Sequence, residues 1–445
     1  MKLKTTSLLI AGALLGAAVL PAQANNDAMI DLLKVLRDQG TITAANYDLL
    51  VNAAKADSEA SQEVANKVDK VAKESTSISL KGGHLKIKSA DKAFSAQIGG
   101  RIMADYTFMD HDDNALSNEG NNSEIRRARI FLKGKIFNDW GYKAQYDFAE
   151  DKLKTKDLYL SYNGFDSTTI TLGNHKMPFG LEEQTSSKYI TFIERSAANE
   201  AFGVGRNNGL SVKTHGDNWT LAGAVHMEGV SDNNSGQDED YGYGARITFA
   251  PIAEKTQVVH LGAAFHHQEF EKDGGASHEI AVNPQVHTAD KFYTSVDVNA
   301  EDYDQFGLEA AVVLGPFSAQ AEYFSRNVNA VSGSEDQDLD AWYVYGSYFL
   351  TGESRKYKAK AGEFSRVKPK SIVGQGGYGA WELGLRYTDL DLEDSNAGIT
   401  GDITTIGLNW YATPTVRFMA NYNMADVDGT SDDFDAFHLR GQIDF

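Results

Sequence analysis

The stretch EIRRARIFLKGKIFNDWGYKAQYDF, residues 124–148, is both strongly basic and strongly apolar. These two characters separate when the stretch is read with a period of two, because successive side chains of a β-strand point to opposite faces. One face would carry Ala128, Ile130, Leu132, Gly134 and Ile136, and the other would carry Arg127, Arg129, Lys133 and Lys135. The stretch is therefore predicted to form a strand with one apolar surface and one cationic surface.

The same period of two continues from Phe94 to the last residue. It predicts about sixteen strands, near residues 94–109, 122–137, 140–150, 154–164, 167–176, 207–215, 218–229, 239–250, 256–270, 304–315, 316–326, 339–350, 376–390, 400–411, 414–427 and 433–445. A soluble β-sandwich would also alternate, since its apolar faces meet in a core. Long strands, aromatic residues near strand ends, and an alternation of tight turns with long polar loops favour a closed transmembrane β-barrel.

The N-terminus predicts export. Lys2 and Lys4 precede an apolar run over residues 8–20 and the small-residue site Ala22-Gln23-Ala24, the arrangement of a signal peptide cleaved near Ala24. The chain has no cysteine, so it has no disulfides. Its formal net charge of −20 argues against nucleic acid as a partner.

Residues 25–78 read differently, as a helical segment that precedes the barrel domain at residues 79–445. Thr43 is a predicted helix cap, and Val64, Val68 and Val71 have the spacing of a coiled-coil seam. Two interpretations stay open here: a short trimeric coiled coil, or a frayed amphipathic linker.

The chain ends in an alternating strand that terminates on Phe445. This resembles the terminal strand that the outer-membrane barrel assembly machinery reads, and it predicts the outer membrane of a Gram-negative bacterium as the location. The predicted partners there are lipid and lipopolysaccharide, to which acidic outer loops would be bridged by divalent cations.

Four segments together resemble the phosphate-selective porin O and P family. They are GRIMADY at 100–106, RRARIFLKGKIFNDWGYKAQYDFA at 126–149, LGNHKMPFGLEEQTSSKYITFIER at 172–195 and YGAWELGLRY at 378–387. The resemblance implies a sixteen-stranded outer-membrane porin, assembled as a homotrimer, whose better-known members pass phosphate or polyphosphate through a constriction lined by arginine and lysine.

The connection at residues 174–206 is rich in apolar side chains for a loop, which predicts that it folds into the lumen as a constriction loop. Its bases are Lys176, Lys188, Arg195 and Arg206. On the wall, alternation predicts an anion path lined by Arg101, Arg127, Arg129, Lys133, Lys135, Lys143, Lys213 and Arg246, with Arg386, Arg417 and Arg440 also facing inward. Inward acids are fewer, so the lumen is predicted to favour small anions such as phosphate.

Three alternatives remain. The inward bases could pair with inward acids and only solvate the wall, which would give a general, weakly selective porin for small hydrophilic solutes. A soluble secreted β-rich binding protein is the second alternative, and an enzyme is the third. Inward His226, His260 and His266 form no recognisable set with a serine and a carboxylate, so no catalytic residue, metal site or cofactor is predicted. The alternation of tight turns and long loops does not explain residues 351–375, a long basic connection on the side of the tight turns.

Overall fold

The computed structural model describes residues 23–111, 120–230, 238–271, 275–393, 398–428 and 433–445. The predicted signal peptide lies outside these ranges except for Gln23 and Ala24. The chain divides into two compact units, a helical unit of residues 1–76 with 89–91, and a β unit of residues 77–88 with 92–445. Within the described ranges, no helix is both long and apolar enough to cross a membrane.

The helical unit consists of α1 (Gln23–Asp38) and α2 (Ala44–Glu74). Gly40, with φ of 72°, turns the chain between them. Thr43 caps α2, since its Oγ1 accepts a hydrogen bond from the backbone N–H of Asn46 at 3.3 Å. Val64, Val68 and Val71 of α2 lie on its surface, exposed by 60%, 42% and 64%. The trimeric seam predicted for these valines stays a prediction.

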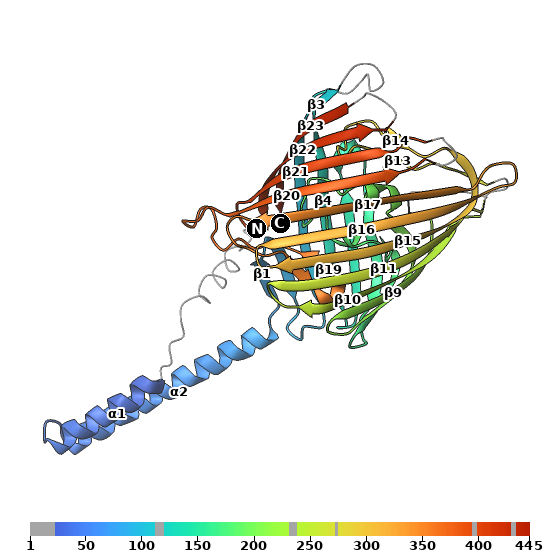
Figure 1. The fold of residues 1–445 in the computed structure, drawn as a ribbon. Coiled ribbons are helices and arrows are strands. Elements are labelled where there is room, and N and C mark those ends of the chain that lie inside the picture. The colour runs from blue at the N-terminus through green and yellow to red at the C-terminus, as the bar shows by residue number, and fades with distance from the viewer. Residues whose placement is uncertain (1–22, 112–119, 231–237, 272–274, 394–397, 429–432) are drawn as a thin grey trace, which may run out of the picture. The chain divides into compact units, whose positions relative to one another are not determined.

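The β unit is a closed barrel of sixteen antiparallel strands, which confirms the predicted fold (Figure 1). The strands are β3 (Ser95–His111), β4 (Asn122–Ile136), β5 (Trp140–Asp147), β6 (Lys154–Tyr162), β7 (Thr168–Lys176), β8 (Arg206–His215), β9 (Trp219–Met227), β10 (Tyr241–Ala253), β11 (Gln257–Glu269), β15 (Val298–Leu314), β16 (Phe317–Ala330), β17 (Gln337–Phe349), β20 (Ala380–Asp391), β21 (Gly401–Tyr411), β22 (Val416–Val427) and β23 (Asp433–Asp444). Each strand pairs with the next, and β23 pairs with β3 to close the ring.

The two faces of each strand separate as the period of two predicts. On β4, Ile130 and Leu132 point outward and are 51% and 41% exposed, whereas Arg127 points inward and is 4% exposed. The apolar outer face suits lipid, and the polar side chains are turned into the lumen.

A short hairpin completes the barrel at the end where β3 begins. It consists of β1 (Ser77–Lys81) and β2 (His84–Lys88), and neither strand was predicted. β2 pairs with residues 95–98 of β3, while β23 pairs with residues 101–111 along the same edge. Phe445 fills the place between them and exchanges backbone hydrogen bonds of 2.6 and 3.1 Å with Gly100. A Cβ on Gly99 would lie 2.5 Å from the carbonyl oxygen of Phe445, so this close approach requires glycine.

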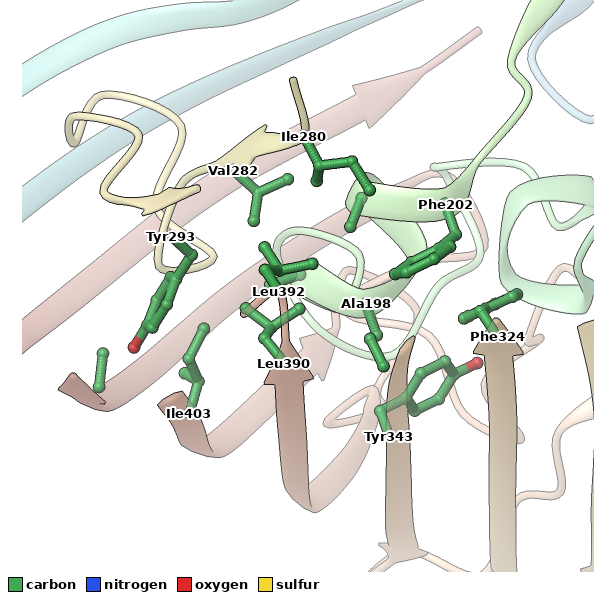
Figure 2. Packing of buried hydrophobic residues seen from close by; sticks show 14 of the residues in the cluster. Ala198, Phe202, Ile280, Val282, Tyr293, Phe324, Tyr343, Leu390, Leu392 and Ile403 are labelled. Atoms are coloured by element: carbon green, nitrogen blue, oxygen red, sulfur yellow. The ribbon is translucent and has the colours of Figure 1, made fainter. Parts of the chain in front are cut away.

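Two long connections fold into the lumen and pack against one side of the wall. The first, residues 177–205, contains α3 (Leu181–Gln184) and α4 (Ala197–Phe202). The second, residues 275–297, contains β12 (Ala276–His278), β13 (Ala281–Val282) and β14 (Tyr293–Thr294). Figure 2 shows side chains of both connections, Ala198, Phe202, Ile280, Val282 and Tyr293, gathered over the wall residues Phe324, Tyr343, Leu390, Leu392 and Ile403. Apolar contacts therefore fill this side of the lumen.

One strand differs in length from its prediction. β15 begins at Val298, six residues before the predicted start near 304, because residues 298–300 pair with β12 of the second infolded connection. The polar and acidic composition of residues 299–304 resembled a loop, and only the tertiary pairing makes these residues a strand.

Candidate functional site

The infolded connection 177–205 leaves a cavity of about 490 Å³ against the wall formed by β3 to β8. Nine cationic side chains line this cavity. They are Arg101 of β3, Arg126, Arg127 and Arg129 of β4, Lys143 of β5, Lys156 of β6, Lys176 of β7, Arg195 of the connection and Arg206 of β8. Seven of these nine were predicted path or loop residues, and we call the cavity the cationic cavity.

The sequence pattern missed Arg126 and Lys156, and β-bulges explain why. Strict alternation assigns both residues to the outer face. The register between β3 and β4 shifts beside Arg126, and the register between β5 and β6 shifts beside Lys156. Each extra residue is turned toward the lumen, which is the usual effect of a bulge on its side chain. The doublet Arg126-Arg127 was the one hint in the sequence, since two adjacent bases cannot both follow the alternation.

Most of these cations form ion pairs. Arg126 and Arg127 each approach Glu194 to 3.0 Å. The other pairs are Arg129 with Asp147 at 2.6 Å, Lys143 and Arg206 with Asp157 at 2.5 and 2.8 Å, and Lys176 and Arg195 with Glu183 at 3.2 Å each. Seven cations therefore share four carboxylates.

Arg101 and Lys156 differ from the other seven. Among the described residues, neither has a carboxylate oxygen within 4.0 Å. The guanidinium of Arg101 donates to the hydroxyl of Ser187 at 2.7 Å. One further carboxylate, Glu363, lines the cavity and pairs with Lys358 at 3.2 Å. The cationic cavity thus keeps a positive balance even with its carboxylates ionised.

Two of the loop carboxylates, Glu183 and Glu194, are charged at neutral pH. Burial alone would raise the pKa of Glu183, but Arg195 and Lys176 outweigh it and lower that pKa to about 2. The pKa of Glu194 is also lowered well below its usual value, because the neighbouring arginines outweigh the effect of burial. Both side chains therefore act as permanent counter-charges for the cavity.

Comparison with known proteins identifies the kind of barrel that holds this cavity. The family model described as phosphate-selective porin O and P matches residues 96–445. The chain belongs to the phosphate-selective porin O and P family. It is an outer-membrane porin of a Gram-negative bacterium.

Individual relatives agree with this family. Porin O of Pseudomonas aeruginosa is 31% identical over 418 residues, which cover 83% of this chain and 92% of the relative. Among solved structures, the trimer form of OmpT, an outer membrane protein of Vibrio cholerae, has a TM-score of 0.52 at 12% identity and covers 79% of this chain and 100% of its own. OprB of Pseudomonas putida has a TM-score of 0.50 at 9% identity, covering 80% and 95%. At these identities the two structures show the fold alone.

The predicted constriction loop of this porin, residues 177–205, is held by arginines of β20, β22 and β23, outside the wall of β3 to β8. Arg417 donates to the backbone oxygens of Ile190 and Thr191 at 2.7 and 2.8 Å. Arg386 donates to the backbone oxygen of Glu194 at 3.1 Å, and Arg440 to that of Ile193. These three arginines face inward as predicted, but they bind the loop rather than the cavity.

A carboxylate fixes the other part of the loop. The oxygens of Glu322 on β16 accept from the backbone N–H groups of Leu181 and Glu182 at 2.5 and 2.9 Å. These are the first residues of α3, where the N–H groups of a helix lack partners within the helix. The loop is thus held through its backbone in two places, at residues 181–182 and at residues 190–194.

The long basic connection at 351–375 folds into the lumen from the short-turn end, which is the periplasmic end of a porin barrel. It forms a hairpin of β18 (Lys356–Lys358) and β19 (Glu363–Ser365). Phe364 of the hairpin packs with Leu181 of the constriction loop. This tertiary contact explains the connection that the sequence pattern left unexplained.

Two predicted path residues lie against this hairpin instead of the cationic cavity. Arg246 pairs with Glu309 at 2.6 Å and donates to the backbone oxygen of Gly362 at 2.9 Å. Lys213 donates to the backbone oxygen of Ala361 at 2.7 Å. The remaining predicted loop base, Lys188, pairs with Asp444 at 3.2 Å.

A second cavity, of about 300 Å³, lies on the periplasmic side of the first. Its lining contains the predicted path residues Lys133 and Lys135, together with Lys86 and Lys88 of β2. Tyr159 lines both cavities. The two cavities therefore follow one another along the wall of β3 to β6, and the hairpin lysines were missed because the hairpin itself was not predicted.

Proposed function

We propose that this porin conducts small anions, phosphate among them, along the cationic cavity and then past the lysines of the second cavity. The observation that carries the proposal is the charge balance: seven cations share four carboxylates, and Arg101 and Lys156 stand outside these pairs. Charge-assisted hydrogen bonds from guanidinium and ammonium groups can replace the hydration of a passing oxyanion. The family name points to the same class of solute.

A general, weakly selective porin is the second candidate function. The ion pairs favour it, because a base neutralised by a carboxylate contributes little net field to the lumen. Selectivity then depends on the two cations without a carboxylate partner, Arg101 and Lys156.

The zero-current potential of the purified porin in a planar bilayer separates the two candidates. Under a potassium chloride gradient, an anion-selective potential is expected, and added phosphate is expected to reduce the chloride current. A weak or cation-selective potential would favour the general porin. Lys154, which pairs with Glu150 at 2.7 Å, lines neither cavity, so Lys154→Gln is the matched control for Arg101→Gln.

We further propose that the porin assembles as a homotrimer and acts as a channel without catalytic activity or cofactor. The trimer form of the Vibrio cholerae OmpT structure supports the oligomer. The exposed valines of α2 would supply a coiled-coil seam between copies. Sedimentation of the detergent-solubilised protein tests this number of subunits.

Two other partners are part of the proposal. The barrel assembly machinery would recognise the strand that ends on Phe445. Lipopolysaccharide would contact the acidic outer loops. Deletion of Phe445 is expected to reduce the amount of folded porin in outer membranes, as measured by heat-dependent electrophoretic mobility.

A further inference from the structure

The carboxylate of Glu194 is shared by three guanidinium groups. Arg126 donates to it from Nε and Nη2 at 3.0 and 3.2 Å, and Arg127 from Nη1 and Nη2 at 3.3 and 3.0 Å. Arg440 donates from Nη2 at 2.5 Å. A carboxylate offers about four lone-pair positions, so these five donors exceed what it can accept at full strength.

The three arginines differ in what else they bind. Arg440 also contacts both oxygens of Asp105, at 2.7 and 2.6 Å. Within the described part of the chain, Glu194 is the sole ion-pair partner of Arg126 and of Arg127. The Nε of Arg127 is buried there without a hydrogen-bond partner. The two arginines of β4 therefore have donor capacity that Glu194 does not use.

Glu194 binds these two arginines from outside the lining of the cationic cavity. Arg126 and Arg127 line the cationic cavity, whereas Glu194 does not and its side chain is 8% exposed. An oxyanion in the cavity would meet the same guanidinium groups from the other side and draw on the same N–H donors. The buried carboxylate of Glu194 is in contact with these guanidinium groups, so its negative charge also repels an oxyanion that binds them.

We propose that Glu194 is a specificity-determining residue that acts through Arg126 and Arg127, by competing with the permeating oxyanion for their donors and so shortening its stay in the cavity. This inference rests on the proposed anion path through the cationic cavity. Conduction requires that an ion leave a site as readily as it enters, so a site that binds too tightly carries little current. Glu194 lowers affinity and thereby raises throughput.

The seating of the constriction loop does not depend on this side chain. Arg386 and Arg417 bind backbone oxygens of the loop, and Glu322 binds backbone N–H groups. Replacing Glu194 with glutamine leaves all of these acceptors and donors in place. The variant therefore removes the charge while the loop stays seated.

The test uses the full-length porin in planar bilayers, with chloride current measured as inorganic phosphate is added. In Glu194→Gln, the phosphate concentration that halves the chloride current is expected to fall by about tenfold, which corresponds to ~1.4 kcal/mol of binding free energy. The chloride conductance without phosphate is expected to stay within about twofold of wild type, since a shift in affinity need not alter the open pathway.

The matched control is Glu200→Gln. Glu200 lies in α4 of the same loop, is exposed to the solvent of the lumen, and forms no ion pair among the described residues. Glu200→Gln removes a carboxylate from the same loop that, unlike Glu194, accepts no hydrogen bond from Arg126 or Arg127. Its half-blocking phosphate concentration is expected to match wild type.

The outcomes separate the inference from the function on which it rests. An unchanged or higher half-blocking concentration in Glu194→Gln overturns the inference, and so does an equal shift in Glu200→Gln. A larger chloride conductance in Glu194→Gln also overturns it, because the residue would then be holding the loop. A wild-type porin whose current phosphate does not reduce would instead refute the anion path itself.

Discussion

Arg101 and Arg129 line the same cavity but have different partners, and this difference gives a two-part prediction. Arg101 donates to the hydroxyl of Ser187 and has no carboxylate within reach among the described residues. Arg129 pairs at 2.6 Å with Asp147, and both side chains are buried. Arg101→Gln therefore removes a charge without depriving any described carboxylate of an ion-pair partner. Arg129→Gln instead leaves the buried carboxylate of Asp147 without its cation.

The expected magnitudes follow from these contacts. A hydrogen bond to a charged group contributes about 1.5–3 kcal/mol, so losing either arginine should weaken phosphate block by about tenfold to a hundredfold. Breaking a buried ion pair by removing one partner costs ~3–5 kcal/mol of folding free energy. Asp147 keeps hydrogen bonds from the backbone N–H groups of Ala128 and Ala149 at 3.0 and 3.4 Å, so the lower end, about 3 kcal/mol, is expected for Arg129→Gln. Arg101→Gln should leave the free energy of unfolding near that of wild type.

Two measurements check this prediction. Phosphate block of the chloride current gives the effect on the path, and urea unfolding in detergent, followed by electrophoretic mobility, gives the effect on stability. If phosphate blocks Arg101→Gln as well as wild type, Arg101 does not meet the permeating anion. If Arg129→Gln unfolds at the same urea concentration as wild type, the pair with Asp147 does not stabilise the barrel and the reasoning from burial fails.

Three further predictions concern the loop and the helices. Replacing residues 177–200 with a short glycine–serine linker should raise the single-channel conductance in chloride, and an unchanged conductance would place the loop outside the path. Folding lowers the pKa of Glu183 to about 2, so the contribution of its ion pairs with Lys176 and Arg195 to holding the loop is complete above the usual value of 4.5 and is lost only as the pH falls through the folded-state value. The conductance should therefore stay constant from about pH 8 to about pH 4 and rise only toward about pH 2; a rise already near pH 5 would contradict this assignment. Finally, Val68→Asp in α2 should shift the detergent-solubilised porin from trimers toward monomers in light scattering, and an unchanged mass would mean that the barrels associate without the helices.

The sequence predicts the barrel well because the fold depends on a local pattern. A strand that spans a membrane must separate apolar from polar side chains residue by residue, and this separation is visible in stretches such as 124–136. The inward positions of Arg101, Arg127, Arg129 and Lys143 follow from that pattern alone.

The composition of the cavity was only partly predictable. Arg126 and Lys156 enter the cavity through bulges, which depend on the register of the partner strand and leave no local sign in the sequence beyond the doublet Arg126-Arg127. Asp157 binds Lys143 and Arg206, but these three residues come from different strands and nothing in the sequence indicates that they meet. Arg246 and Lys213 were assigned to the path from their inward direction, but what they meet there is a hairpin that comes from more than a hundred residues later in the chain.

The closing seam of the barrel has a consequence for how the chain is made. The first barrel strand, β3, finds its second neighbour only in β23, and their contacts, such as Asp105 with Arg440, join residues 335 positions apart. Contacts this distant in the chain form late in folding, because the loop between them must first be closed. A polypeptide that ends before Asp433 would leave β3 and β22 with open edges, ready to pair with other chains. Translation must therefore pass β23 before any copy can close, and an earlier stop yields an aggregation-prone sheet instead of a narrower pore.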